Sequence, residues 1–318
     1  MTGEAVANER LAGVSSLGAI ALLIAGIGLV VAGAELLFEG LLAAATRLRV
    51  SPFALSLIVS GLELENLAAG IAANAKGLSG AAAGTFLGGT TFLALAVAGL
   101  GGLISPIRAP LPPSVIGWLA AAPLPLLLVS VDGDVSRLEG AGLVVWFGVA
   151  LVGMARSRGT VRVRPTGAEQ RRRPFLRVVG GLGVLTAGGA VLADGIGRAV
   201  RDLGVSQTLL GNTAIAAGVE AEEVARVAVP ARRGRGDVAL GNLAGTIVHF
   251  TALNAGVIAL VRPLALDDAS LHLHLPASVC ATAALCMALW VGGGIGRATG
   301  AVFLLLYSGY VAAAIVFA

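Results

Sequence analysis

The sequence has 318 residues, of which 57% are hydrophobic and 13% are charged, and its mean hydropathy is +0.91. These values exclude an ordinary soluble domain, in which about 25% of residues are charged. A formal charge of +4 would suggest nucleic-acid binding in a soluble protein, but in a membrane protein the distribution of the basic residues matters more. The composition therefore predicts a polytopic membrane protein that contacts the lipid bilayer and has no nucleic-acid partner.

Ten apolar runs are long enough to cross a hydrocarbon core of about 30 Å, which takes about 20 helical residues. They cover residues 17–46, 51–75, 80–104, 112–131, 138–155, 175–200, 205–230, 238–261, 271–291 and 296–317. The first run is too long for a cleaved signal peptide, and the residues before it are not a basic region. The sequence thus predicts an all-α fold of ten transmembrane helices.

The basic residues indicate how these helices are oriented. Most of the 22 basic residues fall on one side of the membrane if the N-terminus lies outside, among them Arg47, Arg108, Arg156 and Arg297. Because arginine and lysine are retained in the cytoplasm, we expect both termini to be extracytoplasmic. The arginine-rich stretch 156–174 is then a cytoplasmic linker between residues 1–155 and 175–318. Arginine far outnumbers lysine, which suggests a GC-rich genome and a bacterial plasma membrane.

Three carboxylates stand close together in an otherwise apolar stretch, Gly218-Val219-Glu220-Ala221-Glu222-Glu223. One charge at the centre of a membrane helix costs about 2.5–3.5 kcal/mol, so three together indicate a functional site. An earlier copy, Gly61-Leu62-Glu63-Leu64-Glu65-Asn66, has the glycine and the first two carboxylates at the same positions.

The duplication extends beyond this motif. Glu39-Gly40 recurs 155 positions later as Asp194-Gly195, and several residues of the first copy recur 157 positions later, including Gly84 and Gly88 as Gly241 and Gly245. A constant offset over many positions indicates an internal repeat. Five predicted helices per copy, an odd number, give residues 1–155 and 175–318 opposite orientations. Secondary transporters with this plan bind their substrate near the bilayer midplane, where helices are broken, and we expect breaks at Gly61 and Gly218.

At these residues the sequence resembles the Ca²⁺/cation antiporter superfamily, which includes sodium/calcium and cation/proton exchangers. Each repeat of that family has a Gly-Thr-Ser-x-Pro-Glu-like turn, followed eighteen residues past the glutamate by a Gly-Asn-x-x-Gly-Ser-Asn-like motif. Here Gly241-Asn242-Leu243-Ala244-Gly245-Thr246 begins eighteen residues after Glu223, and Gly84-Thr85-Phe86-Leu87-Gly88-Gly89 begins eighteen after Asn66. The resemblance implies a secondary-active antiporter and not an enzyme.

The sequence departs from the family pattern at several ligand positions. Glu223 occupies the family's cation-binding glutamate position, whereas the first copy has Asn66 there. The polar ligand that the family has four residues after the Gly-Ser pair is replaced by Leu93 and Phe250. The predicted site is therefore asymmetric, and a site for several sodium ions is not expected.

Helical spacing sorts the remaining polar residues, because residues three or four apart share a face. We expect four cation-binding residues: Glu63, Asn66, Glu220 and Glu223, of which the three carboxylates Glu63, Glu220 and Glu223 would hold a metal ion. The residues with secondary roles are Glu65, Glu222, Asn242, Thr246 and His249. Arg226 lies four residues after Glu222, so a structural ion pair between them is expected. His249 either faces the site or is satisfied by a neighbouring helix.

The ligand chemistry suggests which ions bind. Hard divalent cations prefer carboxylate and carbonyl oxygens, and close carboxyl groups raise one another's pKa, so that an empty site takes up protons. We therefore expect exchange of a divalent cation, most plausibly Ca²⁺, for H⁺ or Na⁺ by alternating access, without a cofactor. A sodium/proton antiporter on the same scaffold and a non-transporting cation-sensing or interaction protein remain alternatives, and a homo-oligomer is left open.

Other polar groups have simpler interpretations. Cys280 and Cys286 lie six apart on one predicted helix, which does not allow a disulfide, so they are expected to pack. His272 and His274 stand beside Asp267 and Asp268 near a helix end, a pattern more typical of a solvated loop than of the catalytic metal site of an intramembrane hydrolase.

Overall fold

The computed structural model describes residues 3–60, 64–157, 173–202 and 221–317, and most of them are helical. In the first half the helices are α1 (Gly3–Leu48), α2 (Pro52–Ser60), α3 (Leu64–Ala75), α4 (Ser79–Thr91), η1 (Phe92–Val97), α5 (Ala98–Ile104), α6 (Pro113–Ala121), α7 (Leu124–Val129) and α8 (Arg137–Ser157). In the second half they are α9 (Pro174–Asp202), the helix 221–232, α11 (Gly236–Val248), η3 (His249–Asn254), α12 (Ala255–Val261), η4 (Ser270–His274), α13 (Leu275–Gly292) and α14 (Arg297–Phe317). The η elements are π-helices, in which each backbone hydrogen bond spans five residues.

Four short strands complete the fold: β1 (Ile107–Arg108), β2 (Asp134–Val135), β3 (Leu264–Ala265) and β4 (Gly294–Ile295). Strand β1 pairs antiparallel with β4, and β2 pairs antiparallel with β3. Each pair therefore joins one strand from each half of the chain.

Contacts divide the chain into two compact units, and each unit takes segments from both halves. The first unit comprises residues 1–44 and 166–229, and the second comprises residues 45–165 and 230–318. The sequence repeats and the compact units are therefore different divisions of this chain.

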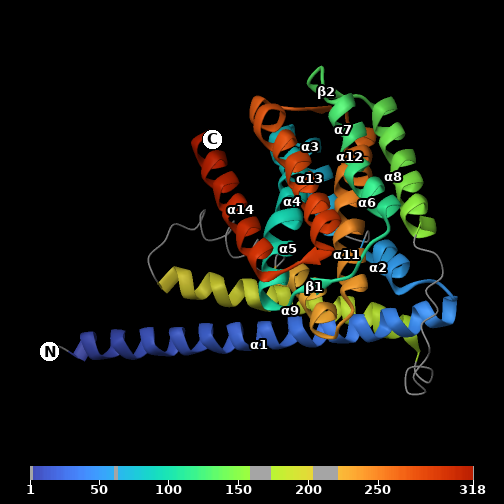
Figure 1. Cartoon of the computed structure of the whole chain (residues 1–318). Helices are drawn as coiled ribbons and strands as arrows, with labels where there is room; N and C mark the ends of the chain where they lie inside the picture. Colours follow the sequence, from blue (N-terminus) through green and yellow to red (C-terminus); the bar gives the residue numbers. More distant parts are fainter. Residues whose placement is uncertain (1–2, 61–63, 158–172, 203–220, 318) are drawn as a thin grey trace. The chain divides into compact units, whose positions relative to one another are not determined.

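The first unit is built on α1 and α9, which run antiparallel and side by side (Figure 1). A Cβ atom at Gly33 would lie 2.5 Å from the backbone nitrogen of Leu185, and one at Gly181 would lie 2.5 Å from that of Leu37. Similar close approaches to the facing backbone occur at Gly26, Gly40, Gly188 and Gly195. The glycines recur every seven residues along each helix, which lets the two backbones touch.

In the second unit, helices from the two halves of the sequence pack on one another: α11 on α2, α12 on α8, and α14 on α5. Glycines again set the approach. A Cβ atom at Gly241 would lie 2.7 Å from the Phe53 carbonyl oxygen, and Gly245 is packed against Ser60 and the Leu57 carbonyl. Phe53 and Leu57 are fully buried in this contact, so α2 and α11 form part of the core of the unit.

The element boundaries in the second unit repeat along the sequence. The series α4, η1, α5 and β1 begins at Ser79, and the series α11, η3, α12 and β3 begins 157 residues later at Gly236 and has the same element lengths. The strand pairings also correspond, because Ile107 lies opposite Ile295 and Leu264 lies opposite Val135. The π-helices stand at equivalent places in both series.

Seven helices of the described part of the chain are long and apolar enough to cross a membrane: those covering 18–48, 79–104, 137–157, 174–198, 236–261, 270–292 and 297–316. This shows an all-helical, multi-pass architecture. The predicted run 112–131 forms two shorter helices, α6 and α7, because Pro123 and Pro125 lack backbone N–H groups and cannot continue α6. The predicted runs 51–75 and 205–230 contain residues outside the described ranges.

Candidate cation site

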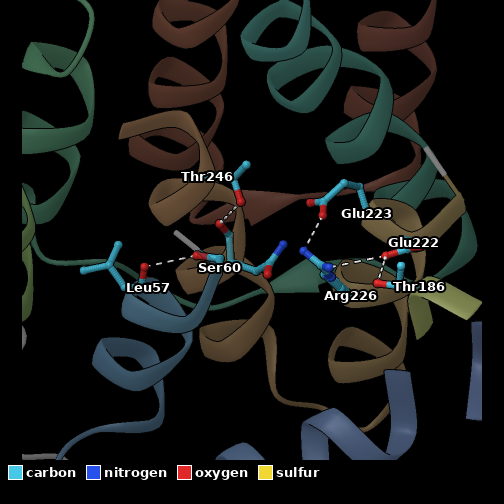
Figure 2. A network of polar contacts seen from close by, with 8 residues as sticks. Leu57, Ser60, Thr186, Glu222, Glu223, Arg226 and Thr246 are labelled. Atoms are coloured by element: carbon cyan, nitrogen blue, oxygen red, sulfur yellow. Dashed lines mark hydrogen bonds and ion pairs between the residues drawn. The ribbon is translucent and has the colours of Figure 1, made fainter. Parts of the chain in front are cut away.

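The polar centre of the first unit is on the helix 221–232. Glu222 and Glu223 are each only 6% exposed. The Arg226 guanidinium donates a hydrogen bond of 2.7 Å to Glu223 Oε1 and a longer one of 3.4 Å to Glu222 Oε2 (Figure 2). Both carboxylates therefore share the guanidinium of Arg226, whose side chain is 11% exposed.

Helical geometry accounts for this sharing. Arg226 is three residues after Glu223 and four after Glu222, and both spacings bring side chains together on a helix. The sequence pattern predicts the contact with Glu222, but the shorter contact in the structure is with Glu223. The cluster therefore places two carboxylates within reach of one guanidinium, so a change in one of these contacts affects the other.

A hydroxyl from α9 completes this cluster. Thr186 Oγ1 donates to Glu222 Oε2 at 3.5 Å, as Figure 2 shows. Glu222 thus receives hydrogen bonds from two elements of the first unit, the helix 221–232 and α9. Nothing in the sequence motifs points to Thr186, because its contact depends on how α9 packs.

A second polar group lies in the second unit along α11 and the start of η3. Asn242, Thr246 and His249 are buried, with exposed fractions of 6%, 0% and 1%. Thr246 Oγ1 donates to the Asn242 carbonyl at 3.2 Å (Figure 2). Their spacing of four and three residues places all three on one face of the helix.

The end of α2 contributes a hydroxyl that sequence reasoning missed. Ser60 is 3% exposed, and its Oγ donates to the Leu57 carbonyl at 3.1 Å. The hydroxyl lies against Gly245, so it faces the same helix as Asn242 and Thr246. Its position directly before Gly61, the predicted helix break, is the sequence signal that could have identified it.

His249 stands at the first position of η3 among aromatic rings. Its ring centroid lies 5.8 Å from that of Phe147, with the rings edge to face. Within the described residues, neither ring nitrogen of His249 and neither amide atom of Asn254 has a hydrogen-bond partner, although all four atoms are buried. Residues five apart lie on the same face of a π-helix, so His249 and Asn254 form one buried polar face of η3.

The two apolar residues that replace the family's polar ligand occupy equivalent positions. Leu93 is the second residue of η1, and Phe250 is the second residue of η3. They are 1% and 3% exposed, and the Phe250 ring packs on Gly89. Both positions are therefore filled by core side chains that have no oxygen to offer a cation.

Several predicted residues lie outside the described ranges. These are Gly61, Glu63, Gly218 and Glu220. Asn66 is half-buried on α3, and the backbone of Glu65 belongs to the same helix. Helix α2 ends at Ser60 and α3 begins at Leu64, on either side of the predicted break.

The two histidines near the start of α13 have separate partners and do not face a common metal position. His272 Nδ1 lies 2.9 Å from Asp268 Oδ1 on the surface, while His274 Nδ1 is hydrogen-bonded at 2.8 Å to the Tyr310 hydroxyl. The described side chains include no cluster of three or more metal-binding residues. Cys280 and Cys286 are both free thiols.

Known proteins resemble this chain in both sequence and fold. The sequence is 29% identical over 271 residues to the inner membrane protein YrbG of Escherichia coli, covering 78% of this chain and 82% of that protein. It is 30% identical over 105 residues to the sodium/calcium exchanger MaX1 of Methanosarcina acetivorans, covering 33% and 30% of the two chains. The fold matches the solved sodium-calcium exchanger NCX_Mj with a TM-score of 0.78 and 21% identity, covering 93% of this chain and 99% of that one.

The family assignment rests on most of the chain. The profile of the family described as sodium/calcium exchanger protein matches residues 18–155 and 174–316, which leaves out the N-terminus and the arginine-rich linker. The chain therefore belongs to the sodium/calcium exchanger protein family, a family of membrane cation transporters and not of enzymes.

Proposed function

We propose that the protein exchanges a divalent cation, Ca²⁺ in the first instance, for H⁺ or Na⁺ by alternating access, with Glu223 as a cation ligand. The main support for this proposal is the buried pair Glu222 and Glu223, both of which contact the guanidinium of Arg226. Two buried carboxylates side by side offer several oxygen atoms to a cation, and carboxylate oxygen is the ligand type that Ca²⁺ prefers.

Arg226 has a definite role in this mechanism. Its guanidinium donates to Glu223, so a cation that binds Glu223 would have to displace this contact, and Glu222 lies within reach of the same guanidinium. Arg226 thereby acts as a tethered counter-ion that prevents two bare carboxylates from facing each other in the empty protein. Glu65, Glu222 and the stripe of Asn242, Thr246 and His249 have supporting roles, while Glu63, Asn66 and Glu220 are proposed as further ligands.

We further propose that the transporter consists of two oppositely oriented five-helix repeats, with both termini outside and ten transmembrane helices in a bacterial plasma membrane. The recurrence of α4, η1, α5 and β1 at an offset of 157 supports this arrangement. The crossed pairing of β1 with β4 and of β3 with β2 supports it as well. Such repeats give two similar conformations that open to opposite sides.

The sodium/proton exchanger is retained as a second candidate because of Leu93 and Phe250. Both are buried side chains without oxygen, and Ca²⁺ needs six to eight oxygen ligands. A monovalent ion or a proton makes smaller demands on the site.

The test is ion flux in vesicles that contain the purified protein, with an imposed Na⁺ or pH gradient and Ca²⁺, Mg²⁺ or Mn²⁺ outside. We expect gradient-driven Ca²⁺ uptake that Glu223→Gln abolishes. Glu39→Gln is the control, because it removes a half-exposed carboxylate of α1 that pairs with Arg177. Sodium/proton exchange without divalent flux would select the second candidate. Cation-dependent thermal stabilisation without any flux would instead indicate a sensor or interaction protein.

A further inference from the structure

A groove with a volume of about 570 Å³ runs along the outer face of α8 in the second unit. It is lined by Trp118 of α6 and by residues of α8 from Val145 to Arg156. Val145, Val149 and Val152 are 66%, 47% and 45% exposed, so this face is apolar and open to its surroundings. We call it the α8 groove.

The sequence explains why a groove forms here. Gly148 and Gly153 leave the α8 backbone uncovered, and the Trp118 indole packs directly onto Gly153. The ring of Trp118 lies 5.8 Å from that of Trp146, whose Nε1 donates to the Ala122 carbonyl at 3.2 Å. The wall formed by Trp118 is therefore held by packing, and the groove does not depend on a mobile side chain.

The dimensions of the α8 groove match one leaflet of a bilayer. Eleven helical residues separate Val145 from Arg156, which corresponds to about 16 Å at a rise of about 1.5 Å per residue. One leaflet contributes about half of a hydrocarbon core of about 30 Å. Arg156 lies in the last turn of α8, so the charged end of the groove is at the membrane surface and the apolar end is near the midplane.

The charge at the surface end selects the head group. Arg156 is exposed, and among the described residues it makes no ion pair or hydrogen bond. A guanidinium binds phosphate oxygens in a bidentate manner, and basic residues at the cytoplasmic surface attract anionic lipids. At an offset of 160 residues, which relates α8 to α14, the second half has Val316 in place of Arg156, so this combination belongs to one half only.

We propose that the α8 groove binds one anionic phospholipid, with its phosphate on Arg156 and an acyl chain along α8 towards Val145. The length of the groove, its apolar walls and its single charged end together fit this ligand. None of the groove's lining residues belongs to the carboxylate cluster, so the proposal does not depend on which ion the protein transports.

The experiment measures tryptophan fluorescence of the full chain in nanodiscs of phosphatidylcholine that contain increasing fractions of phosphatidylglycerol with brominated acyl chains. The background is Trp290→Phe, because Trp290 is 61% exposed and would report bulk lipid. We expect saturable quenching at a low fraction of phosphatidylglycerol. Arg156→Gln should raise the half-saturating fraction about fivefold, because one basic residue near the surface is worth about 1 kcal/mol.

Two matched controls separate a specific site from general lipid contact. Arg297→Gln removes an exposed charge on the same predicted side of the membrane and should leave the quenching curve unchanged. Gly148→Leu should block the groove, whereas Gly142→Leu on the same helix should not, and a Cβ atom meets nothing within 4 Å at either position. Equal quenching by brominated phosphatidylcholine, or equal effects of Arg156→Gln and Arg297→Gln, would overturn the proposal.

Discussion

Glu223 accepts a 2.7 Å hydrogen bond from Arg226, one turn further along the same helix. This contact places a fixed positive charge on the carboxylate proposed to bind the transported cation. If Glu223 binds the cation as proposed, Arg226 competes for the same carboxylate, and affinity for the cation should depend on how easily the guanidinium moves to Glu222.

Replacement of Arg226 tests this competition. Arg226→Gln removes the guanidinium from two buried carboxylates, so we expect the unfolding free energy to fall by about 3 kcal/mol, the usual cost of breaking a buried ion pair. Saturating Ca²⁺ should stabilise the variant more than the wild type, because the competitor is gone. Thermal unfolding in detergent with and without Ca²⁺ measures both effects.

Arg198→Gln is the control for that experiment. Arg198 also pairs with a carboxylate four residues away, Asp194, but their side chains are 53% and 47% exposed. Exposed pairs contribute roughly 0–1 kcal/mol, so little change is expected. Equal destabilisation by the two variants would contradict the view that the Arg226 cluster is a buried site.

The contact of α1 with α9 makes a prediction about stability. At Gly33 a new Cβ atom would meet the Leu185 backbone, which cannot rotate away, so Gly33→Ala should destabilise the protein by about 1–3 kcal/mol. Gly28→Ala, on the same helix with nothing within 4 Å of its Cβ position, should be neutral or slightly stabilising. The shift in melting temperature distinguishes the two, and similar shifts would argue against backbone contact in this pair.

Replacement of His249 is expected to affect stability and transport in opposite directions. The equivalent residue of η1 is Phe92, which packs on Tyr307 with a centroid distance of 5.5 Å, much as His249 packs on Phe147. His249→Phe should therefore fit, and it should raise the unfolding free energy by about 1 kcal/mol because it removes two buried nitrogens that have no partner among the described residues.

The same variant should lose transport if the polar face of η3 serves the ion. His274→Phe is the comparison, because it breaks the hydrogen bond with Tyr310 and should lower stability. A less stable His249→Phe protein with full flux would contradict both expectations.

The Asp267 carboxyl lies outside the apolar helix 270–292, and it should make the stability of the protein depend on pH. Ser270 lowers the pKa of the Asp267 carboxyl, and its backbone N–H donates to Asp267 Oδ1 at 2.8 Å. A lowered pKa means that the ionised form stabilises the folded protein above the unfolded-state pKa, and that this contribution is lost as pH falls through the folded-state value.

Asp267 directly precedes the helical residues that begin at Asp268, and it accepts the Ser270 N–H as an N-cap residue does. Asp267→Ala should therefore cost about 1 kcal/mol at neutral pH, the typical value of a helix cap. The difference from the wild type should shrink in acid. Asp268→Ala provides the control, because Asp268 is 84% exposed and pairs with the surface residue His272. Melting curves between neutral pH and acid would test this, and a difference that persists in acid would contradict the assignment.

Much of the fold follows from the repeat in the sequence. The offset between Gly84 and Gly241 predicts that α4 and α11 occupy equivalent places, and their first residues, Ser79 and Gly236, are separated by the same 157 positions. Helical periodicity likewise predicts the buried stripe of Asn242, Thr246 and His249. These features depend on local spacing, which a sequence records directly.

Other features depend on packing and leave no local pattern. Glu222 and Glu223 are both within helical reach of Arg226, so only the side-chain conformation decides which contact is shorter. The π-helices η1 and η3 form in runs that read as ordinary α-helix, and strands of two residues are too short to show alternation. The pair Arg177 and Glu39 joins α1 to α9 and becomes visible only once these helices are aligned.

The crossed strand pairs have a consequence for biosynthesis. Strands β1 and β2 belong to the first half, but their partners β4 and β3 lie at 294–295 and 264–265, so β1 stays unpaired until nearly the whole chain has left the ribosome. During synthesis of the second half, β1 and β2 of the first half therefore lack their pairing partners. A protein truncated before Gly294 lacks β4, so its β1 should remain unpaired and its fold incomplete. Cleavage within the linker between α8 and α9 should instead give two fragments that still assemble.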